Sequence, residues 1–419
     1  MKALVYYLLC PPHWNKTPPL SGEYLKRYAT KDNIEVKILD LNIILYTLLG
    51  LEKKIWLTLD KDFETSLFSM VKDKHPAFLE NILHMVSPAD AIGFSLFRRN
   101  KHFTFSLINE IKSLYPDKKI VLGGPETLFM KLKKQTLSKD INWVIGEGEK
   151  SIAAILNNKT NTVIEYDELD DLDQIPFLDF TPYQIPLYSA TLPLYSSRGC
   201  IRRCAFCTER LLSSKFRQHS PLYMVEQIQL LMRTHNVSCF SFQDSLINAN
   251  PRWLEEFCRL LLNKNIKIKW EAQAAIRNDF TQRLAQLIKD SGCYNLFIGL
   301  ESASDKVLKR MNKGFTQEEA VNFLTVLHRA GLQYEISLIV GYPGEETKDF
   351  RETHTWLTTH KKIIPKIAQL NPYLDYLSEE MCASQATRQK LTTLMNTIRG
   401  ERIPYTRSFI NNLTYPHGH

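Results

Sequence analysis

Short apolar runs alternate with longer amphipathic stretches along most of the chain, and this pattern predicts repeated strand–helix units. In the first part, the runs that read as buried strands cover residues 3–9, 34–39, 91–96, 119–122 and 143–145. Stretches with helical spacing lie between them, as at residues 22–29 and 103–114. Such alternation is typical of a parallel sheet that is covered by helices. We therefore predict an α/β fold that begins with a doubly wound parallel sheet, which binds ligands at the carboxyl ends of its strands.

The same alternation resumes near residue 192. Six further strands are predicted, at residues 194–197, 239–242, 268–273, 296–300, 334–340 and 367–370. Helices are predicted between them, at residues 222–234, 251–263, 280–291, 317–330 and 350–359. Six such units form a partial (β/α)6 barrel, in which chemistry takes place at the carboxyl ends of the strands.

The chain has 419 residues, which is too many for one hydrophobic core. An acidic stretch at residues 167–173, followed by several prolines, indicates a linker between two domains. We expect a first domain at residues 1–159, a linker at 160–190, the barrel at 191–371 and a short C-terminal extension at 372–419.

Composition places the protein among globular chains, with 44% hydrophobic and 23% charged residues. The net charge of +8 is spread along the sequence, so nucleic acid is not an expected partner. No apolar run is long enough to span a bilayer. Five scattered cysteines lie mostly in apolar runs and are expected to be buried free thiols, which indicates a reducing cytoplasm; they are Cys10, Cys239, Cys258, Cys293 and Cys382.

The clearest chemical feature is a group of three cysteines within eight residues, Cys200, Cys204 and Cys207. Thiolates are the natural ligands of an iron–sulfur cluster, and three of them leave one iron open for another molecule. Three arginines lie beside these cysteines, and we expect them to favour the ionised thiols; they are Arg198, Arg202 and Arg203. Zinc is the alternative, with His219 as a possible fourth ligand, although structural zinc sites usually pair their ligands.

The pattern CxxxCxFC, with Gly199 before it and Phe206 inside it, resembles the radical S-adenosylmethionine superfamily. The resemblance implies that the three cysteines hold a [4Fe–4S] cluster whose open iron binds the amino and carboxylate groups of S-adenosylmethionine. Reductive cleavage of that cofactor would yield a 5′-deoxyadenosyl radical. A reductant such as flavodoxin or ferredoxin would be the partner.

The resemblance also implies contacts with S-adenosylmethionine further along the barrel. Phe206 would place its backbone against the adenine, and Asp244 would receive the methionine amino group. Arg277 would pair with the methionine carboxylate, which its forked guanidinium suits. Two of these residues also have a structural interpretation, since Asp244 could cap a helix and Arg277 could form a surface salt bridge.

Two later strand ends complete the implied cofactor site. Glu301 and Ser302 end the fourth barrel strand and would contact the ribose hydroxyls. Gly341 ends the fifth strand and would allow the cofactor to approach closely, although a tight turn would also need a glycine there. The run Lys309–Gly314 between these two strands matches the superfamily as well.

The first domain resembles the cobalamin-binding domain that precedes many radical S-adenosylmethionine enzymes. The residues that carry this resemblance end predicted strands, and they are Ser95, Gly123, Gly124 and Gly146. The DxHxxG motif, whose histidine ligates cobalt in other cobalamin proteins, is absent. The domain is thus expected either to bind cobalamin or to keep the fold without the ligand.

These resemblances predict an enzyme that methylates an unactivated carbon of a small molecule or peptide with cobalamin. The alternative within the superfamily is a radical rearrangement, cyclisation or oxidation without methyl transfer. A methylthiotransferase acting on tRNA would need three more cluster cysteines in the N-terminal half, which holds only Cys10. A non-catalytic iron–sulfur carrier would have no use for Arg277 and Glu301.

Overall fold

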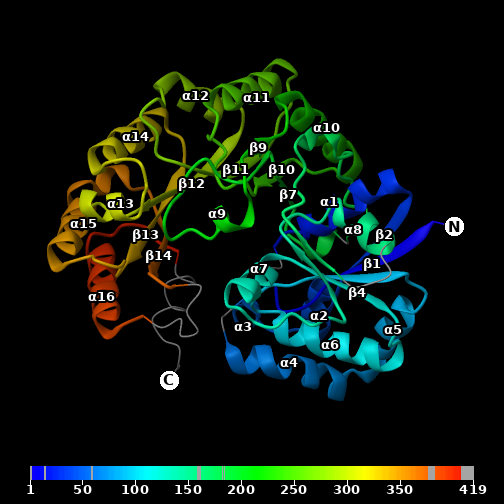
Figure 1. The fold of residues 1–419 in the computed structure, drawn as a ribbon. Helices are drawn as coiled ribbons and strands as arrows, with labels where there is room; N and C mark the ends of the chain where they lie inside the picture. The colour runs from blue at the N-terminus through cyan, green and yellow to red at the C-terminus, as the bar shows by residue number, and fades with distance from the viewer. Residues whose placement is uncertain are drawn as a thin grey trace. The chain divides into compact units, whose positions relative to one another are not determined.

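The computed structural model describes residues 2–13, 16–57, 60–157, 162–181, 183, 185–375 and 383–406. The chain divides into two compact units, Met1–Pro193 and Leu194–His419. Each unit contains one six-stranded sheet and its own helices (Figure 1). The predicted α/β class is therefore confirmed.

The sheet of the first unit is parallel throughout, in the order β2-β1-β3-β4-β5-β6. Its strands are β1 Ala3–Leu9, β2 Ile34–Asp40, β3 Ala91–Ser95, β4 Lys119–Gly123, β5 Asn142–Ile145 and β6 Val163–Glu165. The first five confirm the predicted strands. The sixth was missed because only three residues form it, and two of them are exposed, so no apolar run marks it.

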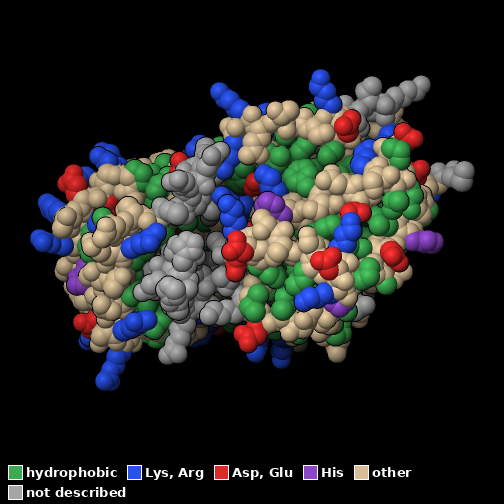
Figure 2. All heavy atoms as spheres, turned by 90° about the horizontal axis from the view of Figure 1, so that it is seen from below, with side chains coloured by type: hydrophobic (Ala, Val, Ile, Leu, Met, Phe, Trp, Pro, Cys, Tyr) green, Lys and Arg blue, Asp and Glu red, His purple; other side chains and the backbone are tan. Residues whose placement is uncertain are grey.

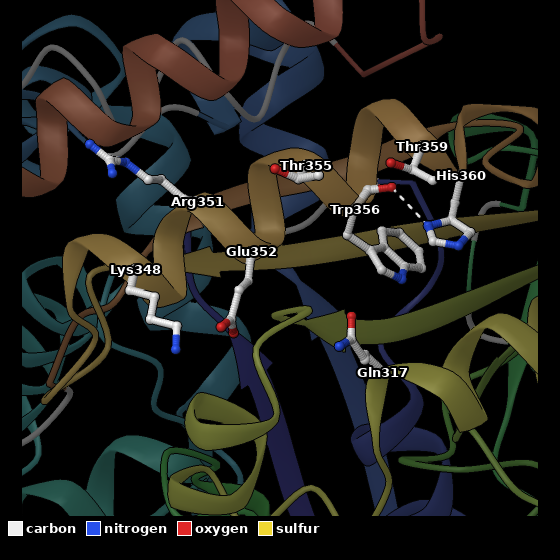
Figure 3. A pocket seen from close by; sticks show the side chains of 8 residues that line it. All are labelled: Gln317, Lys348, Arg351, Glu352, Thr355, Trp356, Thr359 and His360. Atoms are coloured by element: carbon white, nitrogen blue, oxygen red, sulfur yellow. Dashed lines mark hydrogen bonds between the residues drawn. The ribbon is translucent and has the colours of Figure 1, made fainter.

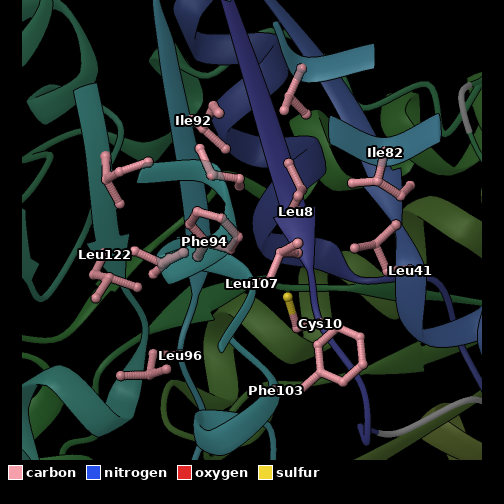
Figure 4. Packing of buried hydrophobic residues seen from close by; sticks show 14 of the residues in the cluster. Leu8, Cys10, Leu41, Ile82, Ile92, Phe94, Leu96, Phe103, Leu107 and Leu122 are labelled. Atoms are coloured by element: carbon pink, nitrogen blue, oxygen red, sulfur yellow. The ribbon is translucent and has the colours of Figure 1, made fainter. Parts of the chain in front are cut away.

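Helices cover both faces of this sheet. They are α1 Leu20–Ala29, α2 Leu41–Leu49, α3 Lys53–Leu57, α4 Lys61–Lys74, α5 Pro76–Val86, α6 Lys101–Leu114, α7 Pro125–Leu132 and α8 Ser151–Asn157. Alternate residues of β1 divide between the two layers, so that Leu8 packs against α2 and α6 while Val5 faces the layer of α1 and α8 (Figure 4). Cys10 lies in the larger core, where burial raises the pKa of its thiol to about 12. The prediction of a buried free thiol is confirmed there.

The predicted linker packs on the first unit. Asp179 accepts hydrogen bonds from Lys26 at 2.6 Å and from Arg27 at 3.1 Å. Tyr188 donates a hydrogen bond to Asp40, whose other oxygen accepts from the backbone N–H of Ile43 at 3.0 Å and so caps α2. The acidic, proline-rich stretch therefore contributes contacts to the sheet domain beyond joining two domains.

Asp40 predicts a pH dependence of stability. Burial raises the pKa of its carboxyl from 3.8 to about 6. Since the unfolded carboxyl ionises at lower pH than the folded one, the free energy of unfolding falls as pH rises from about 4 to about 6, by about 3 kcal/mol in the limit. We expect Asp40→Asn to remove most of this decline in thermal unfolding of the apoprotein. Asp62→Asn, at an exposed position, should keep the decline, and an unchanged slope in Asp40→Asn would contradict the assignment.

The second sheet has the order β14-β13-β12-β11-β10-β7. Its strands are β7 Thr191–Leu194, β10 Cys239–Phe242, β11 Lys269–Ala274, β12 Cys293–Glu301, β13 Tyr334–Val340 and β14 Ile367–Pro372. All six predicted barrel strands are present. The first lies three residues earlier than predicted, because the chain turns at Ser196, whose backbone N–H and hydroxyl donate to a buried aspartate.

Helices pack against one face of this curved sheet (Figure 1). They are α10 Pro221–His235, α11 Pro251–Asn263, α12 Gln282–Asp290, α13 Asp305–Arg310, α14 Gln317–Ala330, α15 Thr347–Thr359 and α16 Gln385–Gly400. Aromatic side chains fill this layer, with the rings of Phe242 and Trp270 centred 5.6 and 6.1 Å from that of Phe257. Cys258 and Cys293 are buried free thiols in the same layer, as predicted, and Cys239 is half-buried, whereas Cys382 lies outside the described residues.

Charged side chains are dispersed over the surface. On the face shown in Figure 2, lysine and arginine side chains occur at many separate places among uncharged ones. Several of them are paired, as Lys72 is with Glu110 at 2.5 Å and Lys361 with Glu401 at 2.7 Å. In the part of the chain that the structure describes, no helix is both long and apolar enough to cross a membrane.

Candidate functional site

The three clustered cysteines lie on a loop that follows β7 of the second sheet. A short antiparallel ribbon closes the base of this loop, formed by β8 Ser197–Arg198 and β9 Arg217–Gln218. Gly199 begins the loop with φ +77°, and a Cβ there would lie 2.4 Å from the carbonyl oxygen of Lys215. Glycine is therefore required at this position, because any side chain would force the base of the loop apart.

Segments far apart in sequence hold the cysteine loop in place. The guanidinium of Arg202 donates to the carbonyl oxygens of Ile276 at 3.1 Å and Gly314 at 3.2 Å. The backbone N–H of Ala205 donates to the carbonyl oxygen of Met311 at 2.9 Å. The loop is thus fixed against the segments that follow β11 and α13, at the end of the sheet where a barrel enzyme carries its site.

All three thiols are half-buried and free. The pKa of Cys200 and of Cys207 is raised, first by burial and then by the neighbouring thiols, Cys204 among them. The Arg202 and Arg203 side chains donate to backbone carbonyls, and the effect expected of the arginines on thiols that hold a cluster stays a prediction. Ionising three adjacent thiols needs a compensating positive charge, which the irons of a cluster would provide.

His219 belongs to the core of the second unit. Its ring stacks on Tyr223 with centroids 4.2 Å apart, and its backbone N–H donates to the carbonyl oxygen of Ser196 at 2.8 Å. Among the residues that the structure describes, no three His, Cys, Asp or Glu side chains are grouped closely enough to hold a single metal ion. These two contacts of His219 are with Tyr223 and Ser196, and neither of them involves the cysteines.

Lys313 connects the cysteine loop to β12. Its ammonium lies 5.7 Å from the ring centroid of Phe206 and 3.5 Å from Oε1 of Glu301. The Phe206 ring also contacts Tyr342 edge-on, with centroids 6.4 Å apart. The sequence did not single out Lys313, although it lies in the run Lys309–Gly314 that matches the superfamily. Phe206 and Glu301, two predicted cofactor contacts, are thus brought to the same place.

Glu301 has an unusual backbone conformation. Its φ of +69° lies in the left-handed region, which costs free energy for a residue with a side chain. The carboxylate turns back over Gly299, where a Cβ would lie 2.5 Å from Oε1, and Oε2 accepts a hydrogen bond from Ser337 at 3.0 Å. Gly299 therefore makes room for the Glu301 carboxylate. Strain of this kind is frequent at functional sites.

Asp244 is fully buried and engaged by the turn before the cysteine loop. It accepts hydrogen bonds from the backbone N–H and the hydroxyl of Ser196, at 3.0 and 2.6 Å, and from the hydroxyl of Ser197 at 2.5 Å. Burial raises the pKa of its carboxyl. Asp244 thus caps no helix; it holds the turn that orients the loop, and its contact with a methionine amino group stays a prediction.

Arg277 and Ser302 also have partners within the protein. Arg277 forms a bidentate salt bridge with Asp279, at 2.7 and 2.6 Å, which is the alternative interpretation of this residue. The Ser302 hydroxyl is buried and lies 3.2 Å from that of Thr353 on α15. Neither of these contacts involves a residue of the cysteine loop.

At Gly341 the close approach comes from the C-terminal helix α16. Its φ is +79°, and a Cβ would lie 2.3 Å from Oγ1 of Thr387. Nearby, Lys390 of the same helix pairs with Glu345 at 2.7 Å. The described geometry therefore explains this glycine by packing between the end of β13 and α16.

In the first unit, the ends of β3 and β4 are joined. The backbone N–H of Leu96 donates to the carbonyl oxygen of Gly123 at 2.7 Å. At Gly124, with φ +94°, a Cβ would lie 2.6 Å from the carbonyl oxygen of Leu96 and 3.1 Å from Oγ of Ser95. Three of the four predicted strand-end residues therefore meet. Gly146, the fourth, lies against Tyr166, with a Cβ position 3.5 Å from its Cα.

The ends of β1 and β3 are linked by Asn100, which is completely buried. Its Nδ2 donates to the carbonyl oxygens of Cys10 at 3.2 Å and Ser95 at 3.0 Å. Beside them the rings of His13 and Phe97 lie with centroids 4.1 Å apart. In the strand order β2-β1-β3, the second and third strands lie on opposite sides of the first. Sheets of this type bind ligands at the carboxyl ends of the two strands where the order switches, which are β1 and β3 here.

A separate pocket lies on the outer helices of the second unit (Figure 3). It has a volume of about 360 Å³ and lies between the start of α14 and one side of α15. Among its lining residues are Gln317, Lys348, Trp356 and His360. None of the predicted site residues lines it, so it is distinct from the cysteine loop.

Residues 194–357 match the family described as the Radical SAM superfamily. An uncharacterized methyltransferase of Pyrococcus horikoshii is 25% identical, over 56% of this chain and 51% of its own length. An anaerobic magnesium-protoporphyrin IX monomethyl ester cyclase of Rubrivivax gelatinosus is 25% identical, over 44% of this chain and 35% of its own length. The chain therefore matches about half or less of these relatives.

Two solved structures share the fold over most of this chain. The cobalamin-dependent S-adenosylmethionine radical enzyme OxsB superposes with a TM-score of 0.67 at 17% identity, over 99% of this chain and 57% of its own. The radical S-adenosylmethionine methyltransferase TsrM from Kitasatospora setae gives 0.65 at 15% identity, over 88% and 75%. The succession of the two sheet domains is thus a known arrangement.

Proposed function

We propose that this chain, an enzyme with a radical S-adenosylmethionine superfamily domain, holds a [4Fe–4S] cluster with Cys200, Cys204 and Cys207. The observation that carries the proposal is the fixed loop with its three free, half-buried thiols. The loop can supply three ligands to one cluster, and its anchors would keep water away from part of it. The bound cluster and S-adenosylmethionine would supply the electron transfer that yields a 5′-deoxyadenosyl radical.

The chain's own residues would then bind and orient S-adenosylmethionine beside the loop. Glu301 offers a carboxylate to hydroxyl donors, and its strained backbone and the space over Gly299 fix where that carboxylate points. Phe206 offers backbone groups. The ammonium of Lys313 lies 5.7 Å from the ring centroid of Phe206 and 3.5 Å from Oε1 of Glu301, so it interacts with both residues. These three residues are the cofactor contacts that the geometry supports best. For Asp244, Arg277, Ser302 or Gly341 to contact S-adenosylmethionine, each would have to give up the contact that it makes within the protein.

We further propose that the first unit binds cobalamin at the ends of β1, β3 and β4, and that the reaction is methylation of an unactivated carbon. Three findings support this proposal: the 2-1-3 strand order, the glycines that bring strand ends together, and the likeness to OxsB and TsrM. A radical cyclisation or oxidation without methyl transfer is the alternative, because one relative is named a cyclase.

The cofactor site predicts the behaviour of Glu301→Gln. Reconstituted protein with dithionite should cleave S-adenosylmethionine to 5′-deoxyadenosine and methionine even without its substrate. We expect Glu301→Gln to weaken S-adenosylmethionine binding by about 1 kcal/mol, because a charge-assisted hydrogen bond becomes a neutral one. Isothermal titration would measure the affinity, with the exposed Glu318→Gln as the matched control. Equal affinities of the two variants would remove Glu301 from the site.

A further inference from the structure

One part of the surface of the second unit carries exposed cations that have no acidic partner. It lies where the cysteine loop meets the end of α13, and we call it the basic patch, formed by Ile201, Arg203, Lys309 and Arg310. Its three cations are exposed, and none of them forms an ion pair with another of the described residues. By contrast, Lys306 of the same helix pairs with Glu346 at 2.8 Å. Like charges left without partners repel one another, and an anionic partner would relieve this repulsion.

Contacts between the cysteine loop and the end of α13 bring these cations together. The side chain of Asn312, just beyond α13, donates to the carbonyl oxygen of Arg203 at 2.9 Å. Lys309 and Arg310 are the last two residues of α13 and therefore lie beside the loop. The Arg310 guanidinium is itself placed by the carbonyl oxygen of Pro343, to which it donates at 3.4 Å. The positive charges thus come from distant parts of the sequence to one surface.

The basic patch adjoins the thiols that are proposed to hold the cluster. Cys204 is half-buried, and its two neighbours in the loop, Arg203 and Ala205, are exposed, so the loop lies close to solvent at this thiol. Ile201 of the same loop is 43% exposed and adds an apolar side chain to the surface. Protein–protein interfaces combine apolar contacts with a polar rim, and electron-transfer partners form small ones. A protein bound at the patch would therefore lie beside the proposed cluster.

The patch suits an acidic protein better than a nucleic acid. A nucleic-acid site typically uses about 6–10 phosphate contacts, whereas three cations and an exposed isoleucine form the patch. Basic side chains elsewhere are dispersed over the face in Figure 2, and several of them are paired. The position beside the thiols also gives a bound electron donor a function, which it would not give to a nucleic acid.

We propose that the basic patch is the docking site of an acidic electron-transfer protein, which gives one electron to the proposed cluster. This inference rests on the proposed function and names the partner of the same site. The partner is oxidised by one electron, and no proton or atom is transferred. Its acidic side chains face Arg203, Lys309 and Arg310, and an apolar side chain packs on Ile201. Because the contact is mainly electrostatic, the patch sets the rate of association and its dependence on salt.

Stopped-flow reduction of the reconstituted holoenzyme tests the docking site directly. Flavodoxin hydroquinone is mixed without oxygen with the protein and S-adenosylmethionine, and the flavin absorbance follows its one-electron oxidation to the semiquinone. We expect Lys309→Glu to lower the second-order rate constant about tenfold at low salt, because it reverses a charge that attracts the donor. The rate constant of the unaltered chain should fall as the salt concentration rises, and that of the variant should fall less.

Lys267→Glu is the matched control. It makes the same change of charge at an exposed position just before β11, at the amino end of that strand. We expect it to change the rate constant by less than about twofold, because it lies outside the patch. If Lys309→Glu takes up no cluster, Lys309→Gln replaces it, with an expected loss of about threefold.

Dithionite separates docking from the chemistry of the site, since a small reductant needs no docking surface. With dithionite, the unaltered chain and both lysine variants should cleave S-adenosylmethionine at the same rate. Equal flavodoxin rate constants in the Lys309 and Lys267 variants overturn the inference, as does a loss that is confined to the binding of a labelled oligonucleotide. If the unaltered chain holds no cluster, the proposed function is refuted instead, so the two failures are distinguishable.

Discussion

Protein in which Cys200, Cys204 and Cys207 are all replaced by alanine is expected to bind no iron–sulfur cluster. The unaltered chain, reconstituted without oxygen, should hold about four irons and four sulfides. Its spectrum should show the visible absorption that arises from sulfur-to-iron charge transfer. The loss should be complete, because the three thiolates are the proposed protein ligands of the cluster. Iron and sulfide analysis together with the absorption spectrum would measure it.

The matched control replaces three cysteines elsewhere in the same unit. Cys258 and Cys293 are buried in the helix-side core, and Cys239 begins β10 away from the loop. Replacing these three by alanine should lower the melting temperature, since two buried side chains lose contacts, yet leave the cluster content unchanged. A full cluster in the first triple variant, or a lost cluster in the second, would contradict the assignment.

Uptake of corrinoid by the first unit is the prediction with the next largest effect. Expressed with hydroxocobalamin, the unaltered chain should purify with about one corrinoid per protein. Gly123→Trp should prevent this uptake, because Gly123 ends β4 at the proposed site and its Cβ position lies 3.9 Å from Val144, in ordinary contact. The backbone can thus accept a side chain there, and the indole would occupy the strand ends. The absorption spectrum of the purified protein measures the corrinoid.

Gly124 would be a poor choice for the same test. Its φ of +94° and the 2.6 Å between its Cβ position and the Leu96 carbonyl oxygen mean that any substitution distorts the β3 end. Gly123→Ala is the better control, and it should keep corrinoid binding. If the unaltered chain cleaves S-adenosylmethionine but never retains corrinoid, methyl transfer is refuted. Cyclisation or oxidation then becomes the proposal.

The cysteine loop and eleven of the strands could be predicted because each is marked by residues that are neighbours in the sequence. Three thiols at close spacing need no partner from elsewhere in the chain to suggest a cluster. Apolar runs predicted eleven of the twelve strands in the two large sheets, and only β6 was missed, since its residues Val163–Glu165 carry no run of their own. The helices between β2 and β3 were also missed, and only for α4 does a largely polar sequence with one buried face give a reason.

The roles of single site residues depended on partners distant in sequence. Asp244 accepts hydrogen bonds from Ser196 and Ser197, which lie 48 and 47 residues away in sequence, so its neighbours alone could not predict them; its contact with a ligand stays a prediction. Thr387 of α16 approaches Gly341 from 46 residues further along the chain, which the sequence around Gly341 does not indicate; its contact with the cofactor stays a prediction. In each case the residue type indicated a buried acceptor or a close approach. The residue type alone does not predict which atoms of the folded chain will lie beside it.

By itself, the sequence predicted the α/β class of both sheets and, from the spacing of Cys200, Cys204 and Cys207, a resemblance to the radical S-adenosylmethionine superfamily, because hydrophobic period and motif spacing are properties of contiguous residues. Only the tertiary structure decided that Lys313 joins Phe206 to Glu301 and that Gly299 admits the Glu301 carboxylate. These facts arise where neighbouring strands and loops meet. Their physical reason is that hydrogen bonds and ion pairs act over a few ångströms, so they are set by which segments the fold brings together.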